Sequence, residues 1–351
     1  MELYNNELWI SDVDAIIDSL PELSELKNKS VMITGATGLI CSSVVDILMR
    51  YNDRFDAGIT VLAAGRDNNK METRFGSQTE RNDFKFVYYD ASKIDNNLNL
   101  PCDYIIHGAS NAFPEMIMRE PVETMLSNFL GMKCLLDYAK RYGVKRLLYV
   151  SSSEVYGRKD GDLPYKEDDF GYIDILNPRN SYSVGKRATE TLCASYAAEY
   201  CVESVIVRPG HIYGPTASLG DNRVSSAWAY DAARGNDIVM KSDGAQMRSY
   251  CYCLDCASAM LKVLLCGENS HAYNISNPNS IINIKSMAAI LAKAGGVDLR
   301  VELPTDDEKK GFNPMNNSSL DSTELSRLGW NGLFDANKGL THTVEIIREI
   351  I

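Results

Sequence analysis

The sequence lacks the features that mark several large classes of protein. No apolar run in its 351 residues approaches the roughly 20 residues that a membrane-spanning helix needs. It contains no internal repeat and no low-complexity tract, and the acidic, polar start of the chain is unlike a secretory signal. Basic residues are outnumbered, and the net charge of −11 would repel a polyanion. We therefore expect a cytoplasmic globular protein with no membrane and no nucleic-acid partner.

A convincing pattern of metal ligands is also missing, although the chain has nine cysteines. Cys251, Cys253 and Cys256 lie close together, but no second ligand cluster accompanies them, and the alternation over residues 250–254 favours a strand. The other cysteines are scattered among apolar residues, as expected for reduced thiols in the cytoplasm. We predict no metal site.

What the sequence does contain is an alternation of strand-like and helix-like segments. Strands are expected at 30–34, 58–63, 84–88, 104–106, 146–150 and 203–208, and helices at 39–49, 122–142 and 181–200. Such alternation is typical of an α/β fold with a Rossmann-type, doubly wound parallel sheet.

After residue 209 the pattern becomes irregular, with helices expected at 225–235, 255–265 and 284–294 and a polar loop at 304–317. We predict a helical extension over residues 1–28 and a Rossmann NAD(P)-binding domain with the catalytic residues over 29–208. Residues 209–351 are expected to form mainly a smaller α/β substrate-binding domain, with part of 236–266 returning to the Rossmann domain.

A glycine-rich turn between the first strand and the first helix predicts a dinucleotide site. Gly35 would allow the tight turn, and Gly38 would let the backbone approach a pyrophosphate at the helix N-terminus. The third glycine of the usual fingerprint, which permits close packing of helix on strand, is replaced by Cys41, a small residue.

The ends of the next strands carry further cofactor candidates. No acid stands at the end of the second strand, where an NAD-binding protein holds the ribose hydroxyls, and Arg66 follows instead. This favours NADP over NAD, unless Arg66 only stacks on adenine or faces solvent. Asp90 could accept a hydrogen bond from adenine or cap its strand. Small residues after the fourth strand, Gly108, Ala109 and Ser110, would let a dinucleotide approach.

The pair Tyr182 and Lys186 is the strongest sign of catalysis. Four residues apart on one helix face, the ammonium would favour the phenolate and so lower the pKa of Tyr182, which makes a general base. Upstream, Ser152 could bind a sugar hydroxyl, and Glu154 could be a second acid or base. The alternatives are a surface pair on an amphipathic helix and, for Glu154, a carboxylate at a helix start.

Three arginines are candidates for a diphosphate or a carboxylate, because guanidinium binds such groups through two hydrogen bonds. They are Arg208, Arg223 and Arg248. Each could instead be an ordinary surface arginine, and Arg208, at a strand end, could serve mainly the structure.

Together these motifs resemble the extended short-chain dehydrogenase/reductase family of nucleotide-sugar epimerases and dehydratases, over residues 30–330. The likeness is strongest to the UDP-glucuronate decarboxylases, through Ser-Ser-Glu-Val-Tyr-Gly (152–157), Asp-Asn-Arg-Val (221–224), Gln-Met-Arg-Ser-Tyr (246–250) and Tyr-Asn-Ile-Ser-Asn-Pro (273–278). Three departures from the pattern are Cys41, the missing acid of the second strand, and His211 in place of an asparagine.

The resemblance implies the roles of most site residues. The catalytic residues would be Ser152, Glu154, Tyr182 and Lys186. The cofactor, NAD or NADP and tightly bound, would contact Gly35, Thr37, Gly38, Leu39, Ile40, Arg66, Asp90, Ala91, Gly108, Ala109, Ser110, Asn128, Tyr182, Lys186, Pro209 and His211. The substrate, a nucleotide-diphosphate sugar, would contact Ser110, Ser152, Ser153, Glu154, Tyr182, His211, Arg223, Val224 and Arg248.

The resemblance implies that the sugar is oxidised at C4 to a 4-keto intermediate. The sequence leaves three fates of this intermediate open: decarboxylation (the preferred hypothesis), loss of water, and epimerisation at C4. A non-catalytic NADP(H) sensor or scaffold is the rival of another class, motivated by the altered glycines and His211. Family members are commonly dimers through a helix pair, which here would be 122–142 and 181–200, so we expect a homodimer.

Overall fold

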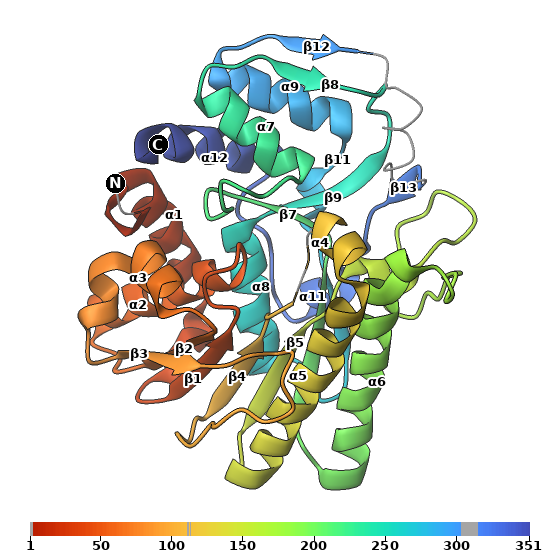
Figure 1. Ribbon diagram of the computed structural model, residues 1–351. Coiled ribbons are helices and arrows are strands. Elements are labelled where there is room, and N and C mark those ends of the chain that lie inside the picture. Colours follow the sequence, from red (N-terminus) through yellow and green to blue (C-terminus); the bar gives the residue numbers. More distant parts are fainter. Residues whose placement is uncertain (1–2, 111, 113, 303–314) are drawn as a thin grey trace.

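The computed structural model describes residues 3–110, 112, 114–302 and 315–351, and its centre is a parallel sheet of seven strands (Figure 1). The strand order is β10-β6-β5-β4-β1-β2-β3, and every neighbouring pair is parallel. Chain order reverses between β1 and β4, and ligands of such sheets bind at the carboxyl ends of the strands at this point. The strands are β1 (Ser30–Thr34), β2 (Thr60–Gly65), β3 (Phe84–Tyr88), β4 (Tyr104–His107), β5 (Arg146–Val150), β6 (Ser204–Pro209) and β10 (Ala272–Ile275).

Helices cover both faces of this sheet because alternate strand residues point to opposite sides. Val31 and Ile33 pack into the core made by α1 (Glu7–Asp18), α2 (Cys41–Phe55), α3 (Asn68–Phe75) and α8 (Cys253–Cys266). Met32, between them, faces the other core, made by α5 (Pro121–Tyr142) and α6 (Ser181–Tyr200). The predicted doubly wound α/β sheet is confirmed.

The sequence predicted several elements to the residue and others with shifted ends. The strands at 30–34, 84–88 and 146–150 and the helix at 181–200 are confirmed. The second strand starts at Thr60 rather than at residue 58, because Gly58 has φ +64°, outside the strand region. The helix expected at 39–49 starts at Cys41 and continues to Phe55, ending where Asp56 takes a left-handed conformation.

The smaller part of the chain forms around β9 (Met247–Tyr252), beside which β7 (His211–Tyr213), β11 (Ile281–Asn283) and β13 (Asn317–Ser318) pair. The other helices there are α7 (Val224–Ala233), α9 (Ile284–Gly295), α11 (Thr323–Arg327) and α12 (Ala336–Ile350), and β8 (Ile238–Met240) pairs with β12 (Leu299–Val301). The loop predicted at 304–317 lies mostly outside the described residues.

The strand predicted over 250–254 is wrong at its end. β9 stops at Tyr252, and Cys253 and Leu254 begin α8, which crosses back to pack on α2, β5 and β6. Cys251 therefore sits on a strand while Cys253 and Cys256 sit on a helix. In the part of the chain that is described, no group of three or more His, Cys, Asp or Glu side chains could hold a metal ion.

The N-terminal segment is helical and built into the core. α1 lies against α2 and also contacts α8 and α12, so the two ends of the chain come together on one side of the molecule (Figure 1). Trp9 is fully buried and donates from Nε1 to Asp46 at 3.0 Å. Asp12 accepts hydrogen bonds from Tyr252 and lies 2.9 Å from Nδ1 of His342.

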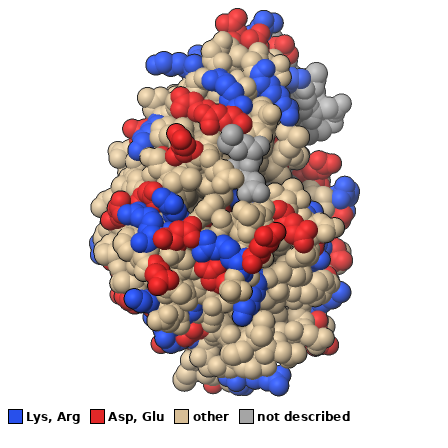
Figure 2. All heavy atoms as spheres, turned by 90° about the vertical axis from the view of Figure 1, so that its left-hand side faces the viewer, with Lys and Arg blue, Asp and Glu red and all other residues tan. Residues whose placement is uncertain are grey.

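Charges of both signs are interspersed on the face formed by the N-terminal side of the molecule (Figure 2). Several of them form ion pairs, such as Arg50 with Asp14 and Arg81 with Asp53. None of the described helices has the length and apolar character to span a membrane.

Candidate active site

The glycine turn after β1 has the geometry that the sequence predicted. Gly35 has φ +67°, and a Cβ on it would lie 2.9 Å from the backbone nitrogen of Ala109 on the neighbouring loop. The Gly38 amide donates to the Gly35 carbonyl at 2.8 Å, which closes the turn before α2. The backbone can therefore come close both to the β4 loop and to a ligand.

Cys41 takes the place of the missing third glycine by packing against another glycine. A Cβ on Gly108, just after β4, would lie 2.3 Å from Sγ of Cys41. Cys41 is 4% exposed, so its thiol fills the space between α2 and the β4 loop. The close helix–strand approach is kept, with the small residue moved from the helix to the loop.

A cavity of about 610 Å³ opens at the carboxyl ends of β1, β2 and β4, within the size range of ligand pockets. Nine of the predicted cofactor residues line it: Gly35, Thr37, Gly38, Arg66, Asp90, Ala91, Gly108, Ala109 and Ser110. The Ser110 hydroxyl is buried and has no hydrogen-bond partner among the described residues. A cradle of small residues with an unpaired hydroxyl fits a dinucleotide.

The end of β2 presents two cations to this cavity. Arg66 and Lys70, the second one missed from the sequence, both line it. Asp67 also lines it, but its carboxylate caps α3 by accepting from the amides of Asn69 and Lys70. One oxygen of the Asp67 carboxylate is therefore already bound to the helix N-terminus.

Asp90 has a partner in its own turn. Although burial alone would raise it, the pKa of Asp90 is lowered, because Ser92 donates two hydrogen bonds to the carboxylate and Arg66 and Lys93 lie nearby. The cap predicted as one alternative is present, and Asp90 also faces the cavity.

Tyr182 and Lys186 are both buried on the first turns of α6. Lys186 Nζ donates to the carbonyl of Val150, the last residue of β5, at 2.7 Å and lies 5.5 Å from the ring centroid of Tyr182. Ser152 follows β5 and caps the short helix η4 (Ser153–Tyr156) by accepting from the Glu154 amide. Strand β5 and helix α6 thus bring the predicted serine, tyrosine and lysine together.

The pKa values of this pair are governed by burial. Burial raises the pKa of Tyr182 to about 12, the Glu154 charge adds to the rise, and the Ser152 hydroxyl, Arg223 and Arg179 oppose it. Burial also lowers the pKa of Lys186 to about 7, against the charge of Glu190. The expected lowering of the Tyr182 pKa by Lys186 is thus absent here, because the low-dielectric surroundings penalise both charged forms.

Glu154 has a partner that the sequence did not reveal. Both of its carboxylate oxygens lie 3.3 Å from the guanidinium of Arg179, and Ser183 Oγ donates to it at 3.1 Å. Arg179 belongs to η5 (Pro178–Asn180), the turn that leads into α6. The carboxylate is therefore held next to Tyr182, at a helix start as one alternative proposed.

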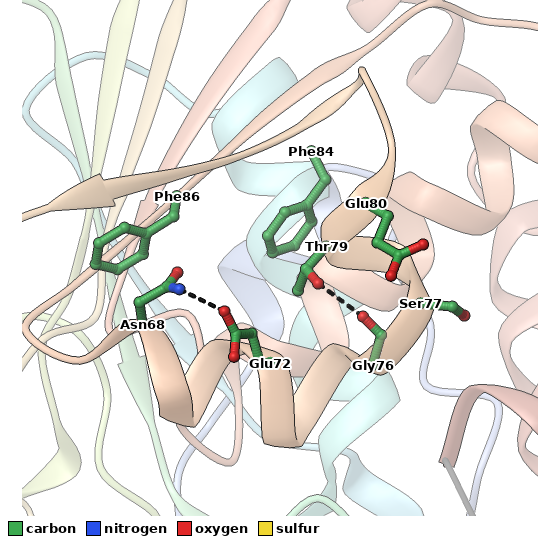
Figure 3. Close-up of a pocket in the computed structure, with 8 residues that line it drawn as sticks. All are labelled: Asn68, Glu72, Gly76, Ser77, Thr79, Glu80, Phe84 and Phe86. Carbon is green, nitrogen blue, oxygen red and sulfur yellow. Dashed lines mark hydrogen bonds between the residues drawn. The ribbon is translucent and has the colours of Figure 1, made fainter.

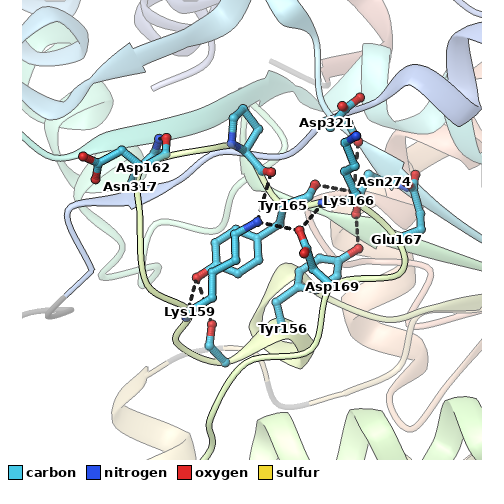
Figure 4. A network of polar contacts seen from close by, with 12 residues as sticks. Tyr156, Lys159, Asp162, Tyr165, Lys166, Glu167, Asp169, Asn274, Asn317 and Asp321 are labelled. Atoms are coloured by element: carbon cyan, nitrogen blue, oxygen red, sulfur yellow. Dashed lines mark hydrogen bonds and ion pairs between the residues drawn. The ribbon is translucent and has the colours of Figure 1, made fainter.

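A polar network fixes the chain that follows Glu154 (Figure 4). The Tyr156 hydroxyl donates to Asn274 Oδ1 in β10 at 2.6 Å, and Asn274 Nδ2 donates to the carbonyls of Tyr165 and Asp321. The loop after η4 is thereby tied to the large sheet and to the segment after β13. Lys159 and Asp169 close the loop with an ion pair of 2.5 Å.

Arg208 is a structural residue, as one alternative from the sequence held. It is 6% exposed, and its guanidinium contacts both carboxylate oxygens of Glu190 on α6 and the Tyr156 hydroxyl. Glu190 also accepts from Ser151 at 2.5 Å. The group is fully engaged behind the site and is not available to a ligand.

On the substrate side of the site, the described residues include a buried arginine that forms no ion pair with a carboxylate. Arg248 in β9 is 4% exposed, and its guanidinium donates to the carbonyl of Met247. No carboxylate pairs with it among the described residues. Burial and the charges of Arg248 and Arg223 lower the pKa of neighbouring His211 to about 3, and its buried Nδ1 has no hydrogen-bond partner within the described part of the chain. Arg223 is paired with Asp221.

Some predicted residues lie apart from the cofactor cavity. Leu39 and Ile40 stand at the start of α2, and Pro209 ends β6. Asn128 is buried in α5, where its amide donates to Thr124 O at 2.7 Å. Val224 begins α7 and is 47% exposed.

A second hollow, formed by α3, the turn after it and β3, contains none of the predicted site residues (Figure 3). Two of its polar side chains are engaged locally, because Asn68 donates to Glu72 and Thr79 donates to the Gly76 carbonyl. The four predicted catalytic side chains line neither hollow; they lie after β5 and on the first turns of α6.

A family model described as the NAD dependent epimerase/dehydratase family matches residues 31–276, more than half of the chain. The chain belongs to this family. UDP-glucuronic acid decarboxylase 1 of Xenopus tropicalis is 29% identical over 329 residues, which cover 93% of this chain and 74% of that protein.

Solved structures of this family share the fold. UDP-glucose 4-epimerase of Thermotoga maritima superposes with a TM-score of 0.75 at 22% identity, covering 92% of this chain and 99% of that chain. UDP-glucuronic acid 4-epimerase of Bacillus cereus, solved with UDP-glucuronic acid and NAD, gives 0.73 at 20% identity, covering 92% and 100%. The family assignment confirms the resemblance stated from the motifs.

Proposed function

We propose that this protein is an NAD(P)-dependent enzyme that converts a nucleotide-diphosphate sugar through a 4-keto intermediate, and that it decarboxylates a UDP-glucuronate-type substrate. The observation that carries the proposal is Arg248. Arg248 is buried and has no acidic partner among the residues that the structure describes, and a buried cation of this kind costs several kcal/mol unless an anion joins it. A diphosphate supplies such an anion, and His211 and Arg223 lie beside it.

The position of this cation relative to Tyr182 supports the same conclusion. The Arg223 charge acts on both Tyr182 and His211, and His211 in turn lies beside Arg248. A ligand anchored through its diphosphate at Arg223 and Arg248 would therefore extend its sugar toward Tyr182 and Ser152. Val224, Ser153 and Ser110 are the proposed remaining contacts.

In the proposed mechanism Tyr182 takes the proton of the sugar 4-hydroxyl while Ser152 holds that hydroxyl in place. NAD(P)+, held by the turn after β1 and the loop after β4, would supply the acceptor for the C4 hydride. Lys186, which donates to the Val150 carbonyl beside the Tyr182 ring, is proposed to bind the nicotinamide ribose. The resulting 4-keto sugar is a β-keto acid and loses its carboxylate as CO2. The carbanion left at C5 then takes up a proton, and Glu154 is the residue proposed to transfer it.

The test is a mass spectrum of the nucleotide sugar after incubation of the protein with UDP-glucuronate and NAD(P)+. We expect a product lighter by one CO2 and no net consumption of cofactor. An unchanged mass with a new chromatographic peak would instead indicate a 4-epimerase, and loss of water from other nucleotide sugars a dehydratase. Tyr182→Phe is expected to abolish turnover; equal behaviour of variant and wild type would favour a non-catalytic sensor.

We also propose that NADP is preferred over NAD. Arg66 and Lys70 face the cavity at the end of β2, where a 2′-phosphate would lie, and Asp67 is occupied at the α3 N-terminus. Arg66→Ala and Lys70→Ala should each weaken NADP binding by about tenfold, the loss of one charge-assisted contact, and leave NAD binding unchanged. Titration by fluorescence measures both, with exposed Lys85→Ala as control; equal weakening of NAD would contradict the proposal.

We propose that the domain boundary lies between residues 29–208 and residues 209–351. We propose in addition that the protein forms a homodimer through α5 and α6. Helices α5 and α6 pack along each other, and α5 exposes Val122, Met125 and Leu126. Apolar side chains grouped on one helix are typical of a helix-pair interface. Light scattering of wild type and of a Val122→Glu variant would test the dimer.

A further inference from the structure

The pair of Glu154 and Arg179 joins two turns that flank Tyr182. η4 carries Glu154 at the end of β5, and η5 carries Arg179 three residues before Tyr182. Each guanidinium nitrogen that faces Glu154 lies 3.3 Å from one carboxylate oxygen, a two-point contact. Ser183, on the first turn of α6, holds the same carboxylate from another direction.

This guanidinium is within electrostatic reach of the proposed base. The Glu154 charge raises the pKa of Tyr182, and the charges of Arg223 and Arg179 lower it. The site therefore has two separate cationic groups near Tyr182. One is at η5, and the other is at the start of α7 and in β9, where the diphosphate is proposed to bind.

Arg179 can exchange the Glu154 carboxylate for the carboxylate of a ligand. The Arg179 and Glu154 side chains are 33% and 36% exposed, so solvent weakens their attraction. By contrast, the Arg208–Glu190 pair behind the site has side chains 7% and 12% exposed and is closed to a ligand. A carboxylate entering beside Tyr182 meets in Arg179 a guanidinium that is already oriented for two-point contact.

We propose that Arg179 is a specificity-determining residue that receives the carboxylate of an acidic sugar nucleotide in place of Glu154. The inference rests on the proposed function and identifies the residue that selects its substrate class, sugar nucleotides with an anion at both ends. The diphosphate binds at Arg248 and the sugar carboxylate at Arg179. Ser183 keeps Glu154 beside Tyr182 after the exchange. Nucleotides of neutral hexoses have no carboxylate to displace Glu154, so they form no ion pair with Arg179.

The test separates acidic from neutral ligands by calorimetry. Tyr182→Phe, saturated with cofactor, prevents turnover and serves as the background for titration with UDP-glucuronate and with UDP-glucose. We expect UDP-glucuronate to bind at least about tenfold more tightly, and Arg179→Gln to remove that preference by weakening UDP-glucuronate alone. Arg179→Lys, which keeps the charge and loses the two-point contact, should retain part of the preference. Arg327→Gln, an exposed arginine in α11, is the matched control.

The outcomes distinguish this inference from the function on which it rests. If both sugar nucleotides bind and Arg179→Gln leaves their affinity ratio unchanged, Arg179 does not select the carboxylate, while the proposed function stands. If neither sugar nucleotide binds to the cofactor-loaded protein, the proposed function fails and the inference fails with it. If Arg179 had only a structural role, Arg179→Gln would weaken the binding of both sugar nucleotides equally, and this result would also overturn the inference.

Discussion

Cys41 and Gly108 show how a dinucleotide loop can keep its packing with an altered glycine pattern. Only one of two facing residues needs to be glycine for the start of α2 to lie against the loop after β4. Here the loop supplies Gly108, and the helix supplies the thiol of Cys41, which is buried against it. The two positions should therefore depend on each other.

Gly108→Ala should destabilise the protein and impair cofactor binding, because the new methyl group would meet the Cys41 sulfur at 2.3 Å. Overpacking of this kind costs about 1–3 kcal/mol in unfolding free energy. Adding Cys41→Gly should recover most of the loss. Urea unfolding and cofactor titration measure both effects, and Gly220→Ala, where no atom lies within 4 Å, is the control. Equal stability of Gly108→Ala and wild type would contradict the packing argument.

The residues that sequence patterns identified are those that lie close together along the chain. Tyr182 and Lys186 share a helix face, and the glycine turn is one local motif. The Glu154–Arg179 pair was missed because 25 residues separate its members, and nothing in a sequence shows that η4 and η5 meet. Arg208 was ambiguous for the same reason: its residue type suggests a ligand, and only Glu190 across the fold shows that it is engaged.

At the scale of elements, Asn274 in β10 links three segments that are distant in sequence. Its side chain accepts from the Tyr156 hydroxyl and donates to the carbonyls of Tyr165 and Asp321, and its backbone N–H donates to the Glu167 carboxylate. The side chain is fully buried, and without it the Tyr156 hydroxyl and the carbonyls of Tyr165 and Asp321 would each lose a hydrogen bond, while the backbone bond to Glu167 would remain. The loop after η4 depends on this residue.

Asn274→Ala should lower the unfolding free energy by about 3 kcal/mol, because buried groups left without a partner cost roughly 1–3 kcal/mol each. It should also speed proteolytic cleavage between residues 157 and 169 and reduce turnover, since Glu154 begins the same segment. Limited proteolysis with mass spectrometry locates the cut. Asn279→Ala, an exposed asparagine of the same region, should leave the digestion pattern as in wild type. Cleavage elsewhere first would show that the network does not hold the loop.

Elements with a clear hydrophobic period were predicted well, and their ends were predicted less well. The helix at 181–200 and three strands match to the residue, and the helix ends where Cys201 takes a left-handed conformation. The β9–α8 junction was misplaced because a strand that enters a buried helix without a loop shows no polar break. Cys251, Cys253 and Leu254 are all fully buried across that junction.

Across the whole molecule, α1 and α12 join the two ends of the chain beside the large sheet. Asn6 donates to Glu349 at 2.6 Å, and Asp12 meets Tyr252 and His342. The sequence predicted helix for residues 1–28 but not this docking, because contacts between the ends of a chain leave no local pattern. Residues 3–28 are thus part of the folded core.

The pH dependence of stability should reveal a histidine buried at the end of β4. His107, 1% exposed, lies between Tyr89 and Tyr149, with its Nδ1 2.7 Å from Thr34 Oγ1. Burial, together with the Lys186 charge, lowers its pKa to about 3. Below an unfolded-state pKa of about 6.5, the unfolded chain binds a proton that the folded protein excludes, so acid lowers the unfolding free energy.

For His107 alone this loss amounts to about 1.4 kcal/mol between pH 7.5 and pH 5.5. His107→Gln should therefore be less sensitive to acid by that amount, even if it is less stable than wild type at pH 7.5. Thr34→Val removes the hydrogen-bond partner and keeps the imidazole, so it should lower stability while retaining the wild-type pH slope. Urea unfolding at fixed cofactor concentration measures all three proteins. Parallel pH profiles of wild type and His107→Gln would mean that the folded core accepts the proton, and that the imidazole is not excluded from charge by its burial.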